Sequence, residues 1–269
     1  MAIVLNEYEW AERMIADRKL GKKPYETLTR VAKYYYERRY SKREVRKMLD
    51  EFLIQCDPDA SLVSWSAALD RITKTAAKYA PIQIDYIRIT LGELEWIAKL
   101  DSKQLRRLAF TMLCVSKYWN IVSENNNDWV NTPDKEIFQM ANITIPGKKQ
   151  DFMYGELIRA GYIKQSKRID NLNVKMLTPE SDDDDVGILV KDFRNLGYQY
   201  MKYCGEPYYE CEKCGITVRD KEYTANRSMQ NSCKRRDSGR KHKYCPTCAA
   251  EMRLKQNVDA VMRRRRSVV

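Results

Sequence analysis

Two short stretches near the end of the chain, Cys211-Glu212-Lys213-Cys214 and Cys245-Pro246-Thr247-Cys248, decide how its C-terminal part can fold. Each is a Cys-x-x-Cys pair, and 30 residues lie between the two pairs. Such paired motifs typically bring their sulfur atoms to one tetrahedral Zn²⁺ ion. The predicted ligands are Cys211, Cys214, Cys245 and Cys248. Because four thiolates leave no open coordination position for a substrate or a water molecule, we expect a structural zinc.

Other interpretations of the cysteines stay open. Disulfides or buried thiols are disfavoured because residues 1–4 run straight into an acidic segment, so we expect no secretory leader. A thioredoxin-like dithiol would need one motif beside a βαβ pattern, which the sequence lacks. A different ligand set would exchange one cysteine for a spare residue, namely Cys204, Cys233 or His242. The two remaining cysteines, on apolar helical faces and therefore expected in the core, are Cys56 and Cys114.

The net charge of +12 is distributed unevenly along the chain. Residues 205–269 contain sixteen Lys and Arg against eight Asp and Glu. Such a positive field favours a polyanion, because Lys and Arg contacts to phosphate release condensed counterions. No apolar run approaches the roughly 20 residues needed to cross a bilayer. We therefore expect a cytoplasmic protein whose partner is nucleic acid, with no membrane and no small-molecule substrate.

Residues 1–100 are predicted to form a helical N-terminal domain that contacts a host or element-encoded protein. Apolar residues recur at three- and four-residue spacing in four segments, 6–19, 24–39, 41–54 and 62–76. The capping residues expected for these helices and for a later one are Asn6, the pair Ser41 and Glu44, and the pair Thr90 and Glu93, with Pro24 in a first turn.

One aromatic and basic run in this domain has two interpretations. Residues 34–36 are all tyrosine and are followed by Arg38 and Arg39, as in some nucleic-acid-binding surfaces. The simpler interpretation, which we favour, packs one or two tyrosines inward and leaves the rest solvated.

Residues 101–178 change in organisation. A long helix through residues 105–116 is followed by a short strand at Trp129-Val130, and Thr132-Pro133-Asp134 supplies a cap and a first-turn proline for a second helix. A third helix ends in Leu157-Ile158-Arg159-Ala160-Gly161 and leads into a two-stranded hairpin over 162–177.

This order of elements resembles a winged helix-turn-helix domain. The resemblance implies that the third helix, about residues 147–160, enters the DNA major groove and that the hairpin touches the backbone or minor groove. The implied contacts are Lys148, Lys149, Gln150, Lys164, Lys167, Arg168 and Lys175. Many winged helices instead bind proteins, so this alternative stays open.

The remainder is predicted to be an acidic linker and connecting element over 179–204, a zinc ribbon over 205–252 and a basic helical tail over 253–269. We interpret residues 180–185 as a solvated linker and not as a magnesium site, because no strand or glycine frames these carboxylates. Residues 186–203 suit either a strand or a helix. Further phosphate contacts are expected from Lys234, Arg235, Arg236, Arg240, Lys241, Lys243, Arg263, Arg264, Arg265 and Arg266.

The whole chain is thus predicted to be mainly α and to bind without catalysing a reaction. It has one histidine, no phosphate-binding loop of the Gly-x-x-x-x-Gly-Lys type and no Gly-x-Ser-x-Gly elbow. The Tyr-Cys-Pro-x-Cys-Ala run at 244–249 and the trailing basic helix resemble proteins of phages and integrated elements in low-GC Gram-positive bacteria. That resemblance implies a DNA-binding protein of replication, transcription control or recombination. Two alternatives are an inhibitor of a host nucleic-acid-handling machine, such as a CRISPR effector, and an RNA-binding protein.

Overall fold

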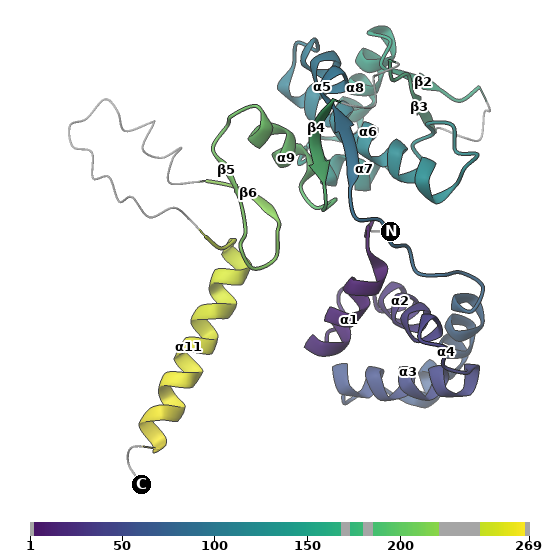
Figure 1. Cartoon of the computed structure of the whole chain (residues 1–269), viewed down its shortest axis with the longest axis vertical. Coiled ribbons are helices and arrows are strands. Elements are labelled where there is room, and N and C mark those ends of the chain that lie inside the picture. The colour runs from purple at the N-terminus through teal and green to yellow at the C-terminus, as the bar shows by residue number, and fades with distance from the viewer. Residues whose placement is uncertain (1–2, 168–172, 180–184, 221–242, 267–269) are drawn as a thin grey trace. The chain divides into compact units, whose positions relative to one another are not determined.

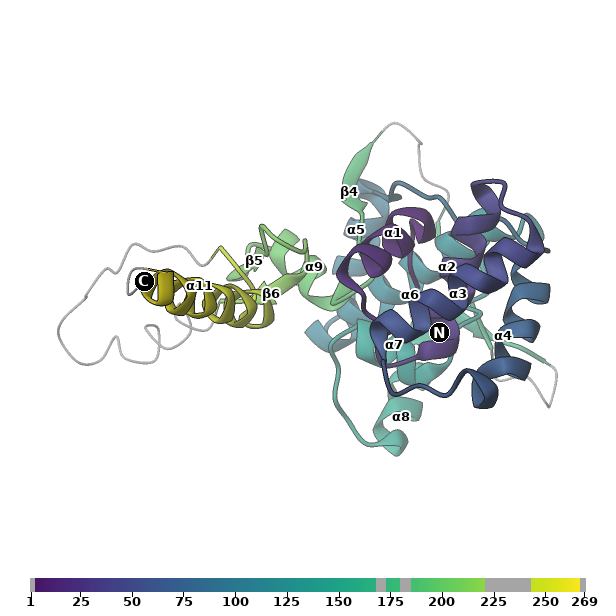
Figure 2. The same cartoon turned by 90° about the horizontal axis from the view of Figure 1, so that it is seen from below.

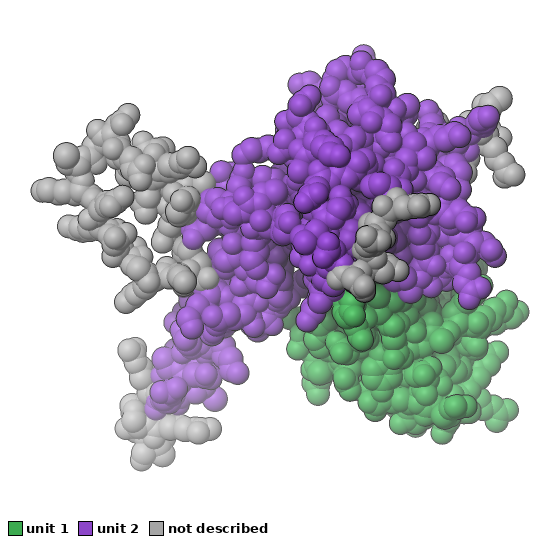
Figure 3. All heavy atoms as spheres, turned by 45° about the horizontal axis from the view of Figure 1, so that its top comes forward, with its two compact units in different colours: residues 1–87 green, residues 88–269 purple. Residues whose placement is uncertain are grey.

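A computed structural model describes residues 3–167, 173–179, 185–220 and 243–266. The described part is mainly α-helical, and its strands form small two-stranded sheets. The chain divides into two compact units, residues 1–87 and 88–269 (Figure 3). In the described residues, no helix combines the length and hydropathy of a membrane span.

The first unit contains four helices that pack side by side (Figures 1 and 2). They are α1 (Glu7–Asp17), α2 (Pro24–Glu37), α3 (Lys42–Cys56) and α4 (Leu62–Ala76). Helix α2 contacts each of the other three. The expected caps are confirmed, since Asn6 caps α1, Pro24 starts α2, and Ser41 with Glu44 forms a capping box on α3.

Two of the three consecutive tyrosines at residues 34–36 of α2 belong to the core of this unit. Tyr34 and Tyr35 are buried, and the Tyr36 hydroxyl donates to the carbonyl oxygen of Thr73 at 3.1 Å. The Arg38 guanidinium lies 4.5 Å from the ring centroid of Tyr34 and pairs with Glu12. Burial raises the pKa of both Tyr34 and Tyr35. The simpler interpretation of this run is therefore confirmed.

A buried carboxylate joins the start of α1 to the rest of the first unit. Glu7 accepts from Arg30 Nε at 3.2 Å and from Lys33 Nζ at 2.8 Å. The same carboxylate accepts from the backbone N–H of Ile82 at 3.1 Å. Because a buried charge is costly unless it is paired and hydrogen-bonded, these contacts fix the position of the segment around Ile82.

The second unit begins with elements that we had expected in the N-terminal domain. Strand β1 (Ile87–Thr90) pairs with β4 (Val186–Val190), and α5 (Leu91–Ala98) contacts both β4 and α6 (Lys103–Val122). The first compact unit thus ends at residue 87, whereas the expected domain ends at 100. Residues 186–203, left open between strand and helix, contain both, because β4 is followed by α9 (Leu196–Tyr203).

Helix α6 is central to the second unit and contacts α5 and α9, among other elements. Around it lie α7 (Asp134–Met140), α8 (Gly147–Arg159), and the antiparallel pair β2 (Ile163–Gln165) and β3 (Val174–Met176). Trp129 forms an isolated antiparallel bridge with Lys175 of β3.

The start of α7 differs from the expected cap. Pro133 occupies the N-cap position and α7 begins at Asp134, so Thr132 is not the cap. The Thr132 hydroxyl instead accepts from the indole N–H of Trp119 on α6 at 3.0 Å. The expected Thr-Pro start was wrong by one position, because a tertiary contact takes the hydroxyl that a cap would have used.

The C-terminal elements connect to this body through α9. They are β5 (Tyr208–Glu210), its antiparallel partner β6 (Thr217–Arg219), and α11 (Pro246–Arg266). Asn142, at the end of α7, donates to the side chain of Asn195 at 2.8 Å, and Asn195 donates to the Thr217 carbonyl oxygen at 2.9 Å. These two hydrogen bonds join α7, α9 and β6 in one chain of contacts.

Close backbone packing at Gly197 makes this connection sensitive to one methyl group. A Cβ atom at Gly197 would lie 2.0 Å from the carbonyl oxygen of Ala141. We expect Gly197→Ala to lower the free energy of unfolding of the second unit by roughly 1–3 kcal/mol, because backbone must shift to admit the methyl group. Urea unfolding followed by circular dichroism would measure this change.

The matched control is Gly155→Ala in α8, where an added Cβ meets no atom within 4 Å. It should be neutral or stabilising by up to about 1 kcal/mol, since alanine favours a helix interior over glycine. Equal effects of the two substitutions would contradict the packing argument.

Candidate metal centre and basic surface

The four cysteines of the two Cys-x-x-Cys pairs come together in space. The sulfur atoms of Cys211, Cys214, Cys245 and Cys248 all lie within 4.8 Å of one another and could hold a metal ion. The distance between Cys214 Sγ and Cys245 Sγ is 3.8 Å. A tetrahedral site with metal–sulfur bonds of about 2.3 Å places its sulfur atoms about 3.8 Å apart. The donor set and its spacing therefore fit a four-thiolate site.

The first pair sits on a tight turn after β5. The Cys211 N–H donates to the carbonyl oxygen of Ile216 at 3.0 Å, and the Gly215 N–H donates to the Cys211 carbonyl oxygen at 2.8 Å. Gly215 has a φ of 73°, which lies in the left-handed region that glycine adopts without steric cost. This turn aims both sulfur atoms of the pair in one direction.

The second pair starts a helix. Pro246 is the first residue of α11, so Cys248 lies in its first turn. One hydrogen bond joins the segments that carry the two pairs. It runs from the N–H of Glu212, inside the first pair, to the carbonyl oxygen of Lys243, just before the second pair, at 2.8 Å. An ion pair of 2.8 Å between Lys213 and Glu251 joins the first turn to α11. A small apolar shell surrounds the cysteines and consists of Ile216, Val218 and Tyr244.

The protein environment acts differently on the individual thiols. At Cys211, burial raises the pKa, but N–H groups of Cys245, Cys214 and Lys213 hydrogen-bond to the sulfur and lower the pKa to about 6. At Cys248, burial and the neighbouring sulfur atoms raise the pKa. Four thiolates in this cluster would repel one another, and a divalent cation would offset half of their negative charge.

Among the described residues, no other cysteine belongs to the four-sulfur cluster. Cys204 is exposed and is absent from the cluster. Cys114 is fully buried in α6 and Cys56 is half-buried in α3. Cys233 and His242 lie outside the described residues.

One face of helix α8 in the second unit exposes both basic and aromatic side chains. Lys148 and Lys149 are exposed in its first turn. Gln150 is engaged locally, because its side-chain amide donates to the carbonyl oxygen of Ile145 at 3.1 Å. Sequence reasoning missed two further exposed residues of α8: Phe152, which is 60% exposed, and Arg159, whose guanidinium lies 5.8 Å from the ring centroid of Phe152. The sequence did contain a signal for this surface. Phe152 follows Lys148 by four residues, which places the two on the same side of a helix.

The β2–β3 hairpin carries the remaining lysines of this region. Lys164 and Lys175 stand directly opposite each other in the register, and Lys167 is exposed beyond β2. Arg168 lies outside the described residues.

The basic residues of the C-terminal part are described only in part. Lys243 is exposed and pairs with Glu212 at 3.5 Å. Arg263 is exposed on α11, and the backbone of Arg264, Arg265 and Arg266 continues this helix. Residues outside the described ranges include Lys234, Arg235, Arg236, Arg240 and Lys241.

Comparison with known proteins adds no relative to this picture. No protein-family model, curated protein or solved structure matches the chain.

The four-sulfur cluster makes a direct prediction about metal content. The double substitution Cys211→Ser and Cys245→Ser should reduce bound zinc from about one ion per chain to none, because each pair loses a thiolate. Elemental analysis of the purified protein would measure the zinc. Proteolysis should become faster within residues 205–250, while the helices of the first unit stay folded.

Cys204→Ser is the matched control, since Cys204 is exposed and outside the cluster. It should leave the zinc content unchanged. Zinc retained at full occupancy by the double variant would contradict the assignment.

Proposed function

We propose that this protein binds double-stranded DNA without catalysing a reaction, and that zinc held by the four cysteines keeps its C-terminal basic segment folded. The observation that carries the proposal is the exposed Lys148 and Lys149 at the start of α8, beside a hairpin with three lysines. In this proposal, residues 101–178 are a winged helix-turn-helix domain. The order α6, Trp129 bridge, α7, α8 and β2–β3 supports that assignment.

The packing of α8 on α7 suits a helix that must present one face to a ligand. The Tyr154 hydroxyl donates to Asp134 Oδ1 at 2.8 Å, and its ring packs edge-on against Phe138 at 5.7 Å. Met153 and Leu157 are buried behind the same helix. With its inner face fixed, α8 keeps its lysines in water, where they can contact phosphate.

Charge and helix polarity act in the same direction at the start of α8. The first N–H groups of a helix carry a partial positive charge and lack partners within the helix. Lys148 and Lys149 add two full charges at the same end. We therefore propose that this end of α8 approaches the DNA backbone and that its outward face lies in the major groove.

We propose that the cluster binds Zn²⁺ as a structural ion in a ribbon over residues 205–252. When bound, the ion would supply the attraction that the small shell of Ile216, Val218 and Tyr244 cannot provide alone. Lys243 and the arginines from Arg263 would then add phosphate contacts. The resemblance to phage proteins suggests a role in the replication, transcription or recombination of an element.

The first unit is proposed to contact a protein partner. Several of its large apolar side chains are exposed, and Val63 of α4 is 88% exposed. Tyr25 is 59% exposed and its ring lies 5.1 Å from that of Trp65. A partner protein of the host or of the same element would cover such a surface.

A salt titration of duplex binding tests the α8 lysines. The double substitution Lys148→Ala and Lys149→Ala should reduce the slope of log affinity against log salt by about two, because each lost phosphate contact removes about 0.9. Fluorescence anisotropy with a labelled duplex at several salt concentrations would measure the slope. Lys74→Ala with Lys78→Ala, both exposed in the first unit, is the matched control. No duplex binding by the unchanged protein at low salt would refute the proposal, and a better bound RNA competitor would point to RNA.

The arginine run of α11 is expected to raise the affinity for duplex DNA without changing the preference for a particular sequence. Changing Arg263, Arg264, Arg265 and Arg266 to glutamine should weaken binding to every duplex by a similar factor, because such contacts reach phosphate and not bases. Affinities for two duplexes of unrelated sequence would be compared, with Arg43→Gln and Lys47→Gln on α3 as the charge-loss control. A loss confined to one of the duplexes would show that these arginines read bases.

A further inference from the structure

Three segments of the second unit form one small antiparallel sheet with two distinct faces. The Trp129 bridge adds residues 128–130 to the outer edge of β3, through hydrogen bonds of 2.9 Å from Val130 N–H to Val174 and 3.0 Å from Met176 N–H to Asp128. One face of this sheet is buried and holds Val130, Ile163, Val174 and Met176. Since successive side chains alternate between faces, Trp129, Lys175 and Lys164 share the other face.

These three residues form a row across the solvent-facing side. Trp129 stands opposite Lys175, and Lys175 stands opposite Lys164. Directly opposed residues have Cβ atoms about 5 Å apart, so these three side chains leave the sheet next to one another on the same face. Trp129 is half-buried, and in the described part of the chain its indole N–H has no hydrogen-bond partner.

The two opposed lysines are electrostatically unfavourable by themselves. Like charges directly opposite each other in a sheet are destabilising. Among the residues that the structure describes, neither Lys164 nor Lys175 has an acidic partner. A bound anion between them would remove this repulsion.

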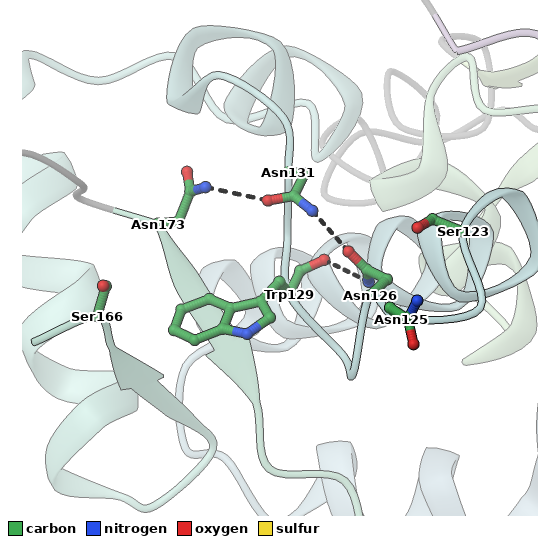
Figure 4. A pocket seen from close by; sticks show the side chains of 7 residues that line it. All are labelled: Ser123, Asn125, Asn126, Trp129, Asn131, Ser166 and Asn173. Atoms are coloured by element: carbon green, nitrogen blue, oxygen red, sulfur yellow. Dashed lines mark hydrogen bonds between the residues drawn. The ribbon is translucent and has the colours of Figure 1, made fainter. Parts of the chain in front are cut away.

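The next row on the same face is neutral and polar. This row lies two residues away from the first row on each of the three segments. It consists of Asn131, Asn173 and Ser166. Figure 4 shows how the amides connect: Asn173 donates to Asn131 at 3.0 Å and Asn131 donates to the buried Asn126 at 2.6 Å. Asn126 in turn donates to the Trp129 carbonyl oxygen at 2.9 Å. This network fixes the strand that carries the indole.

A hollow of about 430 Å³ opens over these residues. Its lining consists of Ser123, Asn125, Asn126, Trp129, Asn131, Ser166 and Asn173 (Figure 4). The lining residues that the structure describes are uncharged, and they combine hydroxyl and amide groups with one aromatic ring. Such a site suits a flat, neutral ligand with hydrogen-bonding edges, whereas the adjoining lysines suit negative charge.

We propose that this sheet face binds an unpaired base of a nucleic-acid strand. The base stacks on the indole of Trp129, groups on the rim of the hollow such as Asn125 bind its edge, and Lys175 and Lys164 hold the flanking phosphates. Stacking needs an exposed base face, which a fully paired duplex does not offer. A neutral sugar would use the ring and the amides but would leave the lysine pair without a role. The inference rests on the proposed function in taking nucleic acid as the ligand.

The test compares three labelled duplexes that differ at one position: fully paired, with a single-nucleotide bulge, and with an abasic bulge that lacks only the base. The unchanged protein should bind the bulge about 5- to 100-fold more tightly than the abasic bulge, as expected from stacking of one base. Trp129→Leu should abolish this preference and keep the affinity for the paired duplex. Trp129→Phe should retain part of the preference, because it retains an aromatic face.

The matched control is Trp65→Leu in the first unit, which removes another half-buried indole and should leave the preference intact. If Trp129→Leu fails to fold by circular dichroism, the exposed Asn125→Ala and Lys164→Ala replace it. Asn125→Ala should reduce the preference for the base, and Lys164→Ala should weaken binding of the bulge and abasic bulge alike. Equal binding of both bulges by the unchanged protein overturns the inference, as does a preference that survives in Trp129→Leu.

A short single strand added as a fourth ligand separates this inference from the proposed function. Single-strand binding that depends on Trp129 supports the inference even if the paired duplex does not bind, in which case only the proposal of duplex binding fails. Duplex binding with no Trp129-dependent binding of any unpaired base overturns the inference and leaves duplex binding standing. Absence of binding to all four ligands overturns both.

Discussion

The second unit depends on the burial of α6 on nearly all sides. Its buried residues include Leu108, Phe110, Leu113 and the polar Thr111 and Ser116. The two hydroxyls return to backbone carbonyl oxygens of the same helix at 2.8 and 3.0 Å, so they can be buried without loss of hydrogen bonds. Because α6 contacts α5, α7, α8, α9 and β3, it sets where the lysine-bearing elements and the connection to the cysteines lie.

The C-terminal part is stabilised differently from the α6 core. It has few apolar residues to bury, and its stability is expected to come from four sulfur atoms around one ion. It is nevertheless joined to the α6 body by the hydrogen bonds of Asn195 and by the close approach of Gly197 to Ala141. Removal of a metal ion bound to the proposed site should therefore loosen residues 205–250 while leaving the α6 core folded.

Two kinds of surface meet in the region of the hairpin. The start of α8 offers exposed lysines on a rigid helix, which suits the regular backbone of a duplex. The outer face of the small sheet offers a ring, a neutral hollow and an unfavourable lysine pair, which together suit a single unpaired nucleotide. The two proposals together place the protein where duplex and unpaired strand adjoin, as at a fork, a bulge or an opened site.

The sequence by itself determined the features that depend on neighbours along the chain. The capping boxes at Ser41 and Thr90 were predicted because cap and partner lie three residues apart. The four-cysteine cluster was predicted because ligand chemistry and spacing restrict the answer, and the end of α8 was predicted from the glycine at 161. The metal, the winged-helix assignment and the DNA contacts remain predictions.

Only the tertiary structure decided which distant segments meet. The pairing of β1 with β4 joins residues about a hundred positions apart, and no local pattern marks it. Thr132 lost its expected cap role to Trp119 for the same reason. The row of Trp129, Lys175 and Lys164 also required the register of three segments, because a shift by one residue would turn each side chain to the other face. Local chemistry fixes caps, turns and metal ligands, whereas packing and register depend on free energies summed over contacts that the linear sequence does not display.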